Sequence, residues 1–213
     1  MNDSSAQRPD ALLLIANGCP HCPTVLQGLS DLVKSGQLGH LEVININVHP
    51  EIAQLHGVRG VPWLRIGPFQ LTGLRSPAEL AQWVQRVQSE EGMREYFNEL
   101  LSAGDLAGVS TTLKRAPESI ATLIQLLGDP DAELQIRLGV SAVLEDLEGS
   151  DALARQIDAL GELGQHTDRR IRIDAAHALG LSHRPAARAY LDVLVKDADD
   201  EVREVATESL AGL

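Results

Sequence analysis

The fold of the first half of the chain is decided by the stretch Leu12-Leu13-Leu14-Ile15-Ala16-Asn17-Gly18-Cys19-Pro20-His21-Cys22-Pro23. An apolar run typical of a buried strand ends in a turn at Gly18, and two cysteines separated by two residues follow. We expect both cysteines on the first turn of a helix. Pro20 suits its first position, where no amide hydrogen is needed. These are the only two cysteines of the chain.

A Cys-x-x-Cys pair in a strand-to-helix setting is typical of a redox-active dithiol. The unpaired N–H groups and the positive dipole end of a helix stabilise a thiolate at Cys19, and the thiolate is the reactive species. His21 lies between the two cysteines and adds positive charge near the sulfur. The stretch therefore predicts a reactive dithiol with an acidic Cys19, tuned by Pro20 and His21.

Length and composition predict two domains without a membrane span. The 213 residues are 44% hydrophobic, which is enough for one large core or two smaller ones. The longest apolar run, Ala11 to Ala16, is far shorter than a bilayer requires. The first ten residues lack the apolar core and cleavage site of a secretory signal. From these features we expect a cytoplasmic protein.

The acidity of the chain belongs to its second half. The formal net charge is −12, and residues 92–213 carry 12 basic and 22 acidic side chains. Proteins bind nucleic acids and anionic membranes through Lys and Arg side chains that neutralise phosphates. The excess of negative charge therefore predicts neither a nucleic acid nor a membrane as partner. Two explanations stay open, namely solubility of a helical array and steering of a partner protein by charge.

Patterning along residues 10–88 alternates strands and helices in the order β-α-β-α-β-β-α. Amphipathic spacing predicts the helices, and β-branched residues with period-two alternation predict the strands. After the strand that precedes Gly18, the predicted elements are a helix over 24–35, a strand over 41–48, a helix over 51–56, a strand over 58–66, a strand over 69–71 and a helix over 77–87.

These residues resemble the thioredoxin superfamily, and specifically its glutaredoxin-like form. Three features carry the resemblance: Cys19-Pro20-His21-Cys22 after the first strand, Gly60-Val61-Pro62 before the third strand, and Gly73 followed by Ser76-Pro77 before the last helix. A lone Cys-x-x-Cys would be a weak signal. Val-Pro about forty residues later, in the right element order, makes the resemblance specific.

The resemblance implies a role for each matching position. Cys19 would attack a substrate disulfide, and Cys22 would resolve the mixed disulfide. Pro62 would follow a cis peptide bond, and Val61 and Pro62 would bind an extended substrate segment as an added strand. Gly60 and Thr72-Gly73 depart from the glutathione-binding pattern of glutaredoxins. Glutathione dependence therefore stays open, and no cofactor is predicted.

Other uses of the two cysteines stay open. They could supply half of a zinc site if His21, His49 or His56 converged on them, although no second cysteine pair exists. They could deliver a metal, or they could be an inert dithiol in a domain used only for binding. Trp63 could line the substrate groove or pack inside the domain, and we expect packing.

The second half is helical and repeats one sequence frame. In this frame, an apolar residue directly precedes an arginine. A small or apolar residue lies three positions after the arginine, and a leucine lies seven positions after it. The frame occurs at Arg137, Arg172 and Arg203, and an acidic or polar turn precedes each copy. This half resembles HEAT-type repeats, with about three repeats over 117–213. We expect the three arginines to contact the acidic turns.

Residues 93–115 are expected to form a helical pair that lacks this arginine frame. Terminal repeats have to cover an exposed apolar face, so we interpret the pair as a cap. The predicted domains are therefore residues 1–90, a thioredoxin-like α/β domain, and residues 91–213, an all-α HEAT-like solenoid. The charged segment around residues 89–92 is the candidate linker.

The function predicted from the sequence is that of a thiol-disulfide oxidoreductase acting on protein disulfides through Cys19 and Cys22. The repeats would bind a substrate or partner protein, and an electron donor or acceptor is implied without being identified. We expect no metal, nucleic acid or membrane partner. The alternative is an adaptor in which the repeats scaffold a complex, and the dithiol senses redox state or is inactive.

Overall fold

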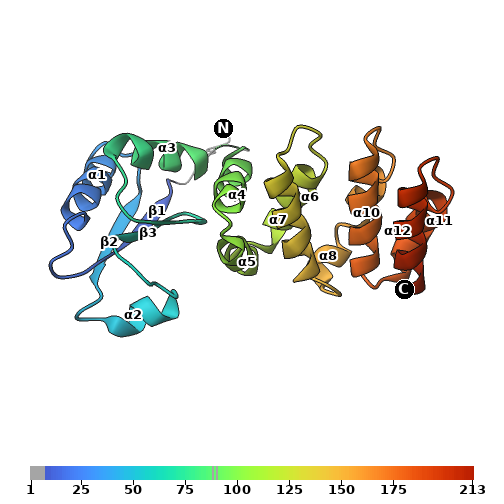
Figure 1. Cartoon of the computed structure of the whole chain (residues 1–213). Coiled ribbons are helices and arrows are strands. Elements are labelled where there is room, and N and C mark those ends of the chain that lie inside the picture. Colours follow the sequence, from blue (N-terminus) through green and yellow to red (C-terminus); the bar gives the residue numbers. More distant parts are fainter. Residues whose placement is uncertain (1–7, 88, 90) are drawn as a thin grey trace, which may run out of the picture. The chain divides into compact units, whose positions relative to one another are not determined.

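Four strands form a mixed sheet in the order β2-β1-β3-β4 (Figure 1). β1 (Asp10–Ile15) runs parallel to β2 (His40–Asn45) and antiparallel to β3 (Trp63–Ile66), and β3 continues antiparallel into β4 (Phe69–Thr72). The computed structural model describes residues 8–87, 89 and 91–213. It divides into two compact units, Met1–Met93 and Arg94–Leu213.

Two helices cover one face of this sheet. α1 (Cys22–Lys34) and α3 (Pro77–Val87) pack against each other and against β1 and β3. They approach closely because Gly28 has no side chain: a Cβ there would lie 2.7 Å from Leu80 Cδ1. Alternation along the strands places Leu13 and Leu64 beneath these helices, and both are fully buried.

The opposite face carries a smaller apolar cluster beside the short helix α2 (Pro50–Leu55). Leu12, Leu14 and Trp63 form the buried centre of the cluster. The partly buried residues packed around it are Ile44, Ile46, Ile52, Val58 and Val61. Trp63 is only 5% exposed and stacks on His56 with ring centroids 5.2 Å apart, so the expectation that Trp63 packs inside the domain is confirmed.

Two predicted strands are shorter than expected. β2 ends at Asn45 instead of residue 48 because Asn45 Oδ1 accepts the Asn47 N–H at 3.0 Å, which turns the chain. β3 begins at Trp63 instead of residue 58, after the cis peptide bond between Val61 and Pro62. The predicted order β-α-β-α-β-β-α is confirmed.

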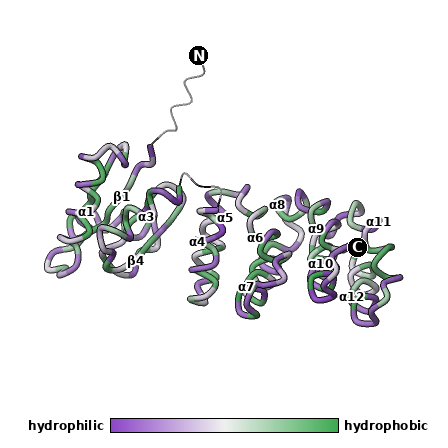
Figure 2. The backbone as a smooth tube through the Cα atoms, turned by 90° about the horizontal axis from the view of Figure 1, so that it is seen from above, coloured by the Kyte–Doolittle hydropathy of each residue, from purple (hydrophilic) through white to green (hydrophobic). Residues whose placement is uncertain are grey.

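The second unit contains helices only among its described residues. The helical pair at its start is α4 (Gly92–Ser102) and α5 (Leu106–Arg115). The remaining helices are η1 (Pro117–Ser119), α6 (Ile120–Leu127), α7 (Leu134–Glu145), α8 (Asp151–Ala154), α9 (Ile157–Leu163), α10 (Arg169–Leu181), η2 (Pro185–Ala187), α11 (Arg188–Leu194) and α12 (Asp200–Ala211). Figure 2 shows hydrophobic and hydrophilic residues interleaved along these helices, as in amphipathic elements.

The helices α4, α7, α10 and α12 stand side by side in one row (Figures 1 and 2). An arginine near the start of a helix in this row pairs with an aspartate of the following repeat. Arg172 Nε and Nη2 donate to the two carboxylate oxygens of Asp197 at 2.8 and 2.9 Å. Arg137 also pairs with an aspartate of the following repeat, Asp174, but through Nη2 alone. These bridges join consecutive repeats.

The expectation for the frame arginines is correct at Arg172 and Arg203 and wrong at Arg137. Arg172 and Arg203 both reach the turn before α12. Arg172 binds the carboxylate of Asp197, and Arg203 Nη1 donates to the main-chain carbonyl of Asp197 at 2.6 Å. Arg137 instead contacts Asp174 inside α10. One turn of helix separates Asp174 from the acidic turn before α10, so the sequence frame alone could not choose between the two partners.

The expectation that residues 93–115 lack the arginine frame is also wrong. Met93-Arg94 begins α4, with Phe97 three positions and Leu101 seven positions after the arginine. Arg94 pairs with Asp129 in the turn before α7, the counterpart of the contact between Arg172 and Asp197. α4 is therefore the first member of the row of frame helices.

Close contact between repeats depends on glycines. A Cβ added at Gly161 in α9 would lie 2.3 Å from the ring of Tyr190 in α11. At Gly180 in α10, it would lie 2.8 Å from Cβ of Ser209 in α12. A methyl group at either position would force the packed helices apart. Among the described residues, no helix combines the length and apolar character needed to cross a bilayer.

Candidate active site

The candidate active site begins with a tight turn after β1. The Cys19 N–H donates to the Ala16 carbonyl at 3.3 Å, and Gly18 has a φ of +73°. A positive φ at the third residue of a turn requires glycine, because a side chain would collide with the backbone. Gly18 therefore allows the chain to reverse and to place Cys19 directly after the strand.

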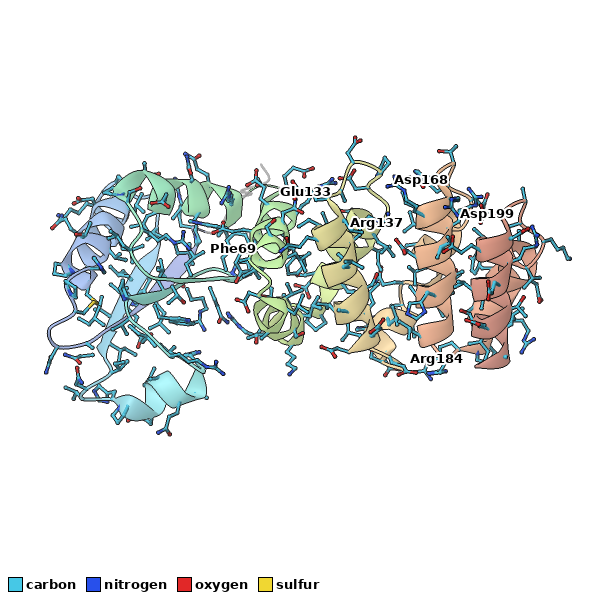
Figure 3. All side chains as sticks on the ribbon, viewed as in Figure 1. Phe69, Glu133, Arg137, Asp168, Arg184 and Asp199 are labelled. Atoms are coloured by element: carbon cyan, nitrogen blue, oxygen red, sulfur yellow. A yellow bond between two sulfur atoms is a disulfide. The ribbon has the colours of Figure 1, made fainter. Side chains whose placement is uncertain are left out.

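Cys19 and Cys22 form a disulfide with Cα atoms 5.5 Å apart (Figure 3, sulfur in yellow). Their exposure differs. Cys22 is 5% exposed and therefore buried, whereas Cys19 is only half-buried. Cys19 is therefore the more solvent-accessible residue of the pair.

The helix starts later than the sequence predicts. α1 begins at Cys22, with His21 as its N-cap, so Pro20 and Cys19 precede the helix. The expectation that Pro20 occupies the first helical position is wrong, and Pro23 takes the early position that proline favours. Pro20 and His21 are both exposed.

Cys19 nevertheless contacts the start of the helix. The Cys22 N–H donates to Cys19 Sγ at 3.1 Å. The first N–H groups of a helix have no partner within the helix, and they carry its positive dipole end. In the reduced protein, the same donor would stabilise a thiolate at Cys19.

The segment Val61-Pro62 lies at the edge of the sheet from which the dithiol turn leaves. β3 begins at Trp63, which pairs with Leu14 near the end of β1. Pro62 is buried, and its carbonyl accepts the Gly73 N–H at 2.8 Å. Among the described residues, no main-chain partner bonds to the N–H or C=O of Val61. The main chain of Val61 is therefore available to an extended peptide.

Three asparagines brace the turn before Cys19, and sequence reasoning assigned them no chemistry. The Asn17 N–H donates to Asn47 Oδ1 at 2.7 Å, and Asn45 Nδ2 donates to Asn17 Oδ1 at 2.9 Å. With the bond from Asn47 N–H to Asn45 Oδ1, these contacts tie the loop after β1 to the end of β2. The sequence offered one signal, the Asn-x-Asn spacing of a side-chain turn.

No alternative metal set is seen in the described part of the chain. Residues 8–87, 89 and 91–213 contain no group of three or more His, Cys, Asp or Glu side chains that could hold a metal ion. His49 lies beside Glu51, with Nδ1 3.1 Å from Oε1, and His56 stacks on Trp63.

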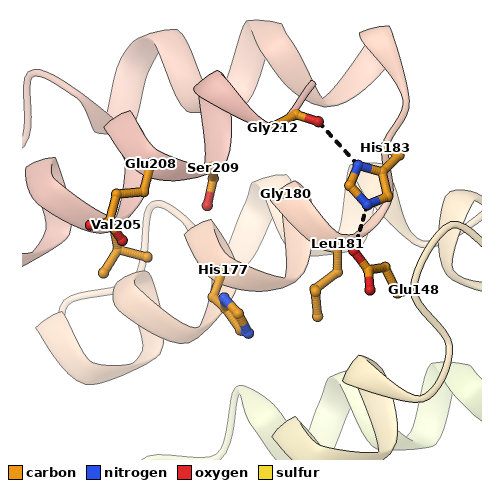
Figure 4. Close-up of a pocket in the computed structure, with 9 residues that line it drawn as sticks. All are labelled: Glu148, His177, Gly180, Leu181, His183, Val205, Glu208, Ser209 and Gly212. Carbon is orange, nitrogen blue, oxygen red and sulfur yellow. Dashed lines mark hydrogen bonds and ion pairs between the residues drawn. The ribbon is translucent and has the colours of Figure 1, made fainter.

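A hollow of about 220 Å³ between α10 and α12 holds the other histidines that face acidic groups (Figure 4). His183 contacts the Gly212 carbonyl through Nδ1 at 3.1 Å and Glu148 through Nε2 at 2.6 Å. The hydrogen bond to Glu148 raises the pKa of His183 above its ordinary value, and the Gly212 carbonyl adds to this effect. These contacts dock the C-terminal helix on the preceding repeat, which is a structural use of the histidine.

Fold and site together define a thioredoxin-fold unit with a Cys-x-x-Cys disulfide and a helical-repeat unit. Comparison with known families agrees. Residues 12–85 match the family model of a thioredoxin domain, and residues 120–211 match that of HEAT repeats. The chain therefore carries a thioredoxin domain followed by HEAT repeats. A thioredoxin domain indicates redox function, and HEAT repeats indicate protein interaction.

Two further comparisons add little. No curated protein matches the chain. One solved structure, the crystal structure of an engineered protein, is 20% identical with a TM-score of 0.39. The match covers 62% of this chain and 60% of that one.

Proposed function

We propose that this protein is a thiol-disulfide oxidoreductase that reduces disulfides of protein substrates. The observation that carries the proposal is the difference in exposure between the two cysteine residues, because Cys19 is half-buried with its sulfur accepting the Cys22 N–H, whereas Cys22 is buried. Disulfide exchange needs such an order, because one sulfur must meet the substrate and the other must resolve the intermediate.

In the first step, the Cys19 thiolate attacks one sulfur of the substrate disulfide. A bond forms between Cys19 Sγ and that sulfur, the substrate disulfide breaks, and the second substrate sulfur leaves as a thiolate. The Cys22 thiolate then attacks Cys19 Sγ and releases the first substrate sulfur. The substrate has gained two electrons, and the protein holds the Cys19–Cys22 disulfide. An external dithiol reductant returns it to the dithiol state.

Substrate recognition is proposed for two surfaces. Val61 and Pro62 would hold an extended substrate segment, with the unpaired main chain of Val61 pairing to it as an added strand. The HEAT repeats would bind the protein that carries the disulfide, because stacked repeats present an extended surface. Pro20 and His21 would tune the reactivity of Cys19. The cytoplasmic location stays a prediction.

Reduction of insulin by dithiothreitol tests the proposal against the adaptor alternative. We expect the wild-type chain to accelerate precipitation of the insulin B chain, and the Cys19→Ser variant to fall to the uncatalysed rate. The Arg170→Ala variant, changed at an exposed position of the repeats, is the matched control and should retain the full rate. A wild-type rate equal to background would favour the adaptor.

A further inference from the structure

A pocket of about 490 Å³ opens in the helical-repeat unit between α5, the start of α6, the turn after α7, and α8. Its volume lies within the range of pockets that hold small ligands or peptide side chains. The elements that form it are labelled in Figure 1. We name it the α5–α8 pocket.

The interior of the α5–α8 pocket is apolar. Leu113 and Ile120, which are 6% and 1% exposed, belong to the core of the repeats and also line the pocket. Pro117, Leu147 and Ala152 complete the apolar lining. An aliphatic or aromatic side chain in this pocket would be removed from water. This burial favours binding, because such a side chain makes no hydrogen bonds to water that it would lose.

Two exposed cations, Lys114 and Arg155, also line the pocket. In the described part of the chain, neither side chain has an ion pair or hydrogen-bond partner, and the single lining carboxylate, Asp146, pairs with neither. The exposed Arg188 and Lys196 also have no such partner among the described residues, but most arginines of the repeats engage carboxylates. The arginines with such partners are Arg94, Arg137, Arg169, Arg170, Arg172, Arg184 and Arg203.

The charge around the pocket contrasts with that of its surroundings. Residues 92–213 carry 22 acidic and 12 basic side chains, whereas the pocket lining holds two cations and one carboxylate. Unpaired cations beside an apolar interior complement a ligand that joins an apolar group to an anion. The acidic excess over the rest of the unit disfavours an anionic ligand there on average.

We propose that the α5–α8 pocket binds an extended peptide segment of the partner protein, with an apolar side chain inserted between Leu113 and Ile120 and a neighbouring Asp or Glu against Lys114 and Arg155. This assignment rests on the proposed partner-binding role of the repeats. It names the chemistry of the recognised segment, which is an apolar residue followed directly by acidic ones.

Titration of the full-length ¹⁵N-labelled protein with the peptide acetyl-Gly-Leu-Leu-Asp-Glu-amide tests the proposal. We expect saturable NMR shifts at the amides of Leu113, Ile120 and Leu147. The isosteric peptide ending in Asn-Gln should bind about fivefold more weakly, the loss expected from one partly exposed charged contact. Lys114→Ala and Arg155→Ala should each weaken binding of the acidic peptide by a similar factor.

Lys196→Ala and Arg188→Ala are the matched controls, because they remove exposed cations of the same unit that do not line the pocket. The proposal is overturned by equal binding of the acidic and amide peptides, by control variants that weaken binding as much as the pocket variants, or by no saturable shifts at about 5 mM peptide. Insulin reduction measured on the same samples reports the dithiol separately, so either proposal can fail alone.

Discussion

Individual residues decide where the sulfur of Cys19 lies. Gly18, with its positive φ, reverses the chain after β1, and the Cys22 N–H then reaches Cys19 Sγ. The Asn17, Asn45 and Asn47 side chains hold the same loop from the end of β2. The spacing of the cysteines was visible in the sequence. The asparagine contacts were not, because they join residues 28 and 30 positions apart.

Replacement of Asn47 tests whether the asparagines position the dithiol turn. Asn47→Ala removes the acceptor for the Asn17 N–H, so it should lower the free energy of unfolding by about 1 kcal/mol. It should also lower the rate of insulin reduction, because the turn before Cys19 loses this contact. Asn47→Asp keeps an acceptor oxygen at the same place, so its stability should remain near that of the wild type. Chemical denaturation and the insulin assay check this, and two variants with identical stability would contradict the role.

Elements were predicted better than their ends and their partners. Alternating apolar residues predicted the strands. Helical spacing of apolar residues predicted α3, whose bounds match the prediction over residues 77–87. α1 begins at Cys22 instead of Pro20, the first helical position that the sequence predicts, and β2 ends three residues before its predicted end because the Asn45 side chain turns the chain there. The frame at Arg94 was missed although Met93, Phe97 and Leu101 occupy its apolar positions.

The bridge between α10 and the turn before α12 gives a prediction about stability. Arg172 and Asp197 are 16% and 12% exposed, and Arg172 also donates to the carbonyls of His166 and Thr167. Arg172→Ala leaves the Asp197 carboxylate without this partner in a mostly buried place and should cost about 2 kcal/mol.

Thermal denaturation measures this loss, with Arg170→Ala as the control. Arg170 is 56% exposed, and its pairing with Asp168 is open to solvent, so its removal should cost less. Insulin reduction per molecule should be unchanged in both variants. A full loss of activity in Arg172→Ala with unchanged stability would assign this arginine to the site instead.

The contact of His183 with Glu148 makes the last repeat sensitive to pH. Figure 3 shows Arg184, the next residue, just beyond one end of helix α10, with Asp168 at its other end. The pKa of His183 is raised in the folded protein, chiefly by Glu148, so folding favours the protonated ring. This contribution is complete below about pH 6.5, the ordinary histidine pKa, and disappears as the pH rises through the higher folded value.

We therefore expect the wild type to lose more thermal stability than His183→Asn between pH 6 and pH 8. Asn tolerates the positive φ of 48° at this position, so the variant removes the charge without new backbone strain. Parallel pH-dependent slopes for the two proteins would show that His183 does not contribute.

At the largest scale, the dithiol and most of the acidic charge lie in different units. Both cysteines lie in the thioredoxin unit, and most of the negative charge lies in the repeats. Fold class and the candidate dithiol could be predicted because local spacing encodes them. The α5–α8 pocket could not, because its lining residues span positions 110 to 155 and meet only when the repeats stack.

The central claim is that Cys19 is the attacking sulfur and Cys22 the resolving one. Single-cysteine variants test this assignment. Each variant is mixed with an excess of a chromogenic aryl disulfide at pH 7, and the rate of mixed-disulfide formation is measured. We expect Cys22→Ser, which keeps the half-buried Cys19, to react at least about tenfold faster than Cys19→Ser, which keeps the buried Cys22. Equal rates, or a faster Cys19→Ser variant, would contradict it.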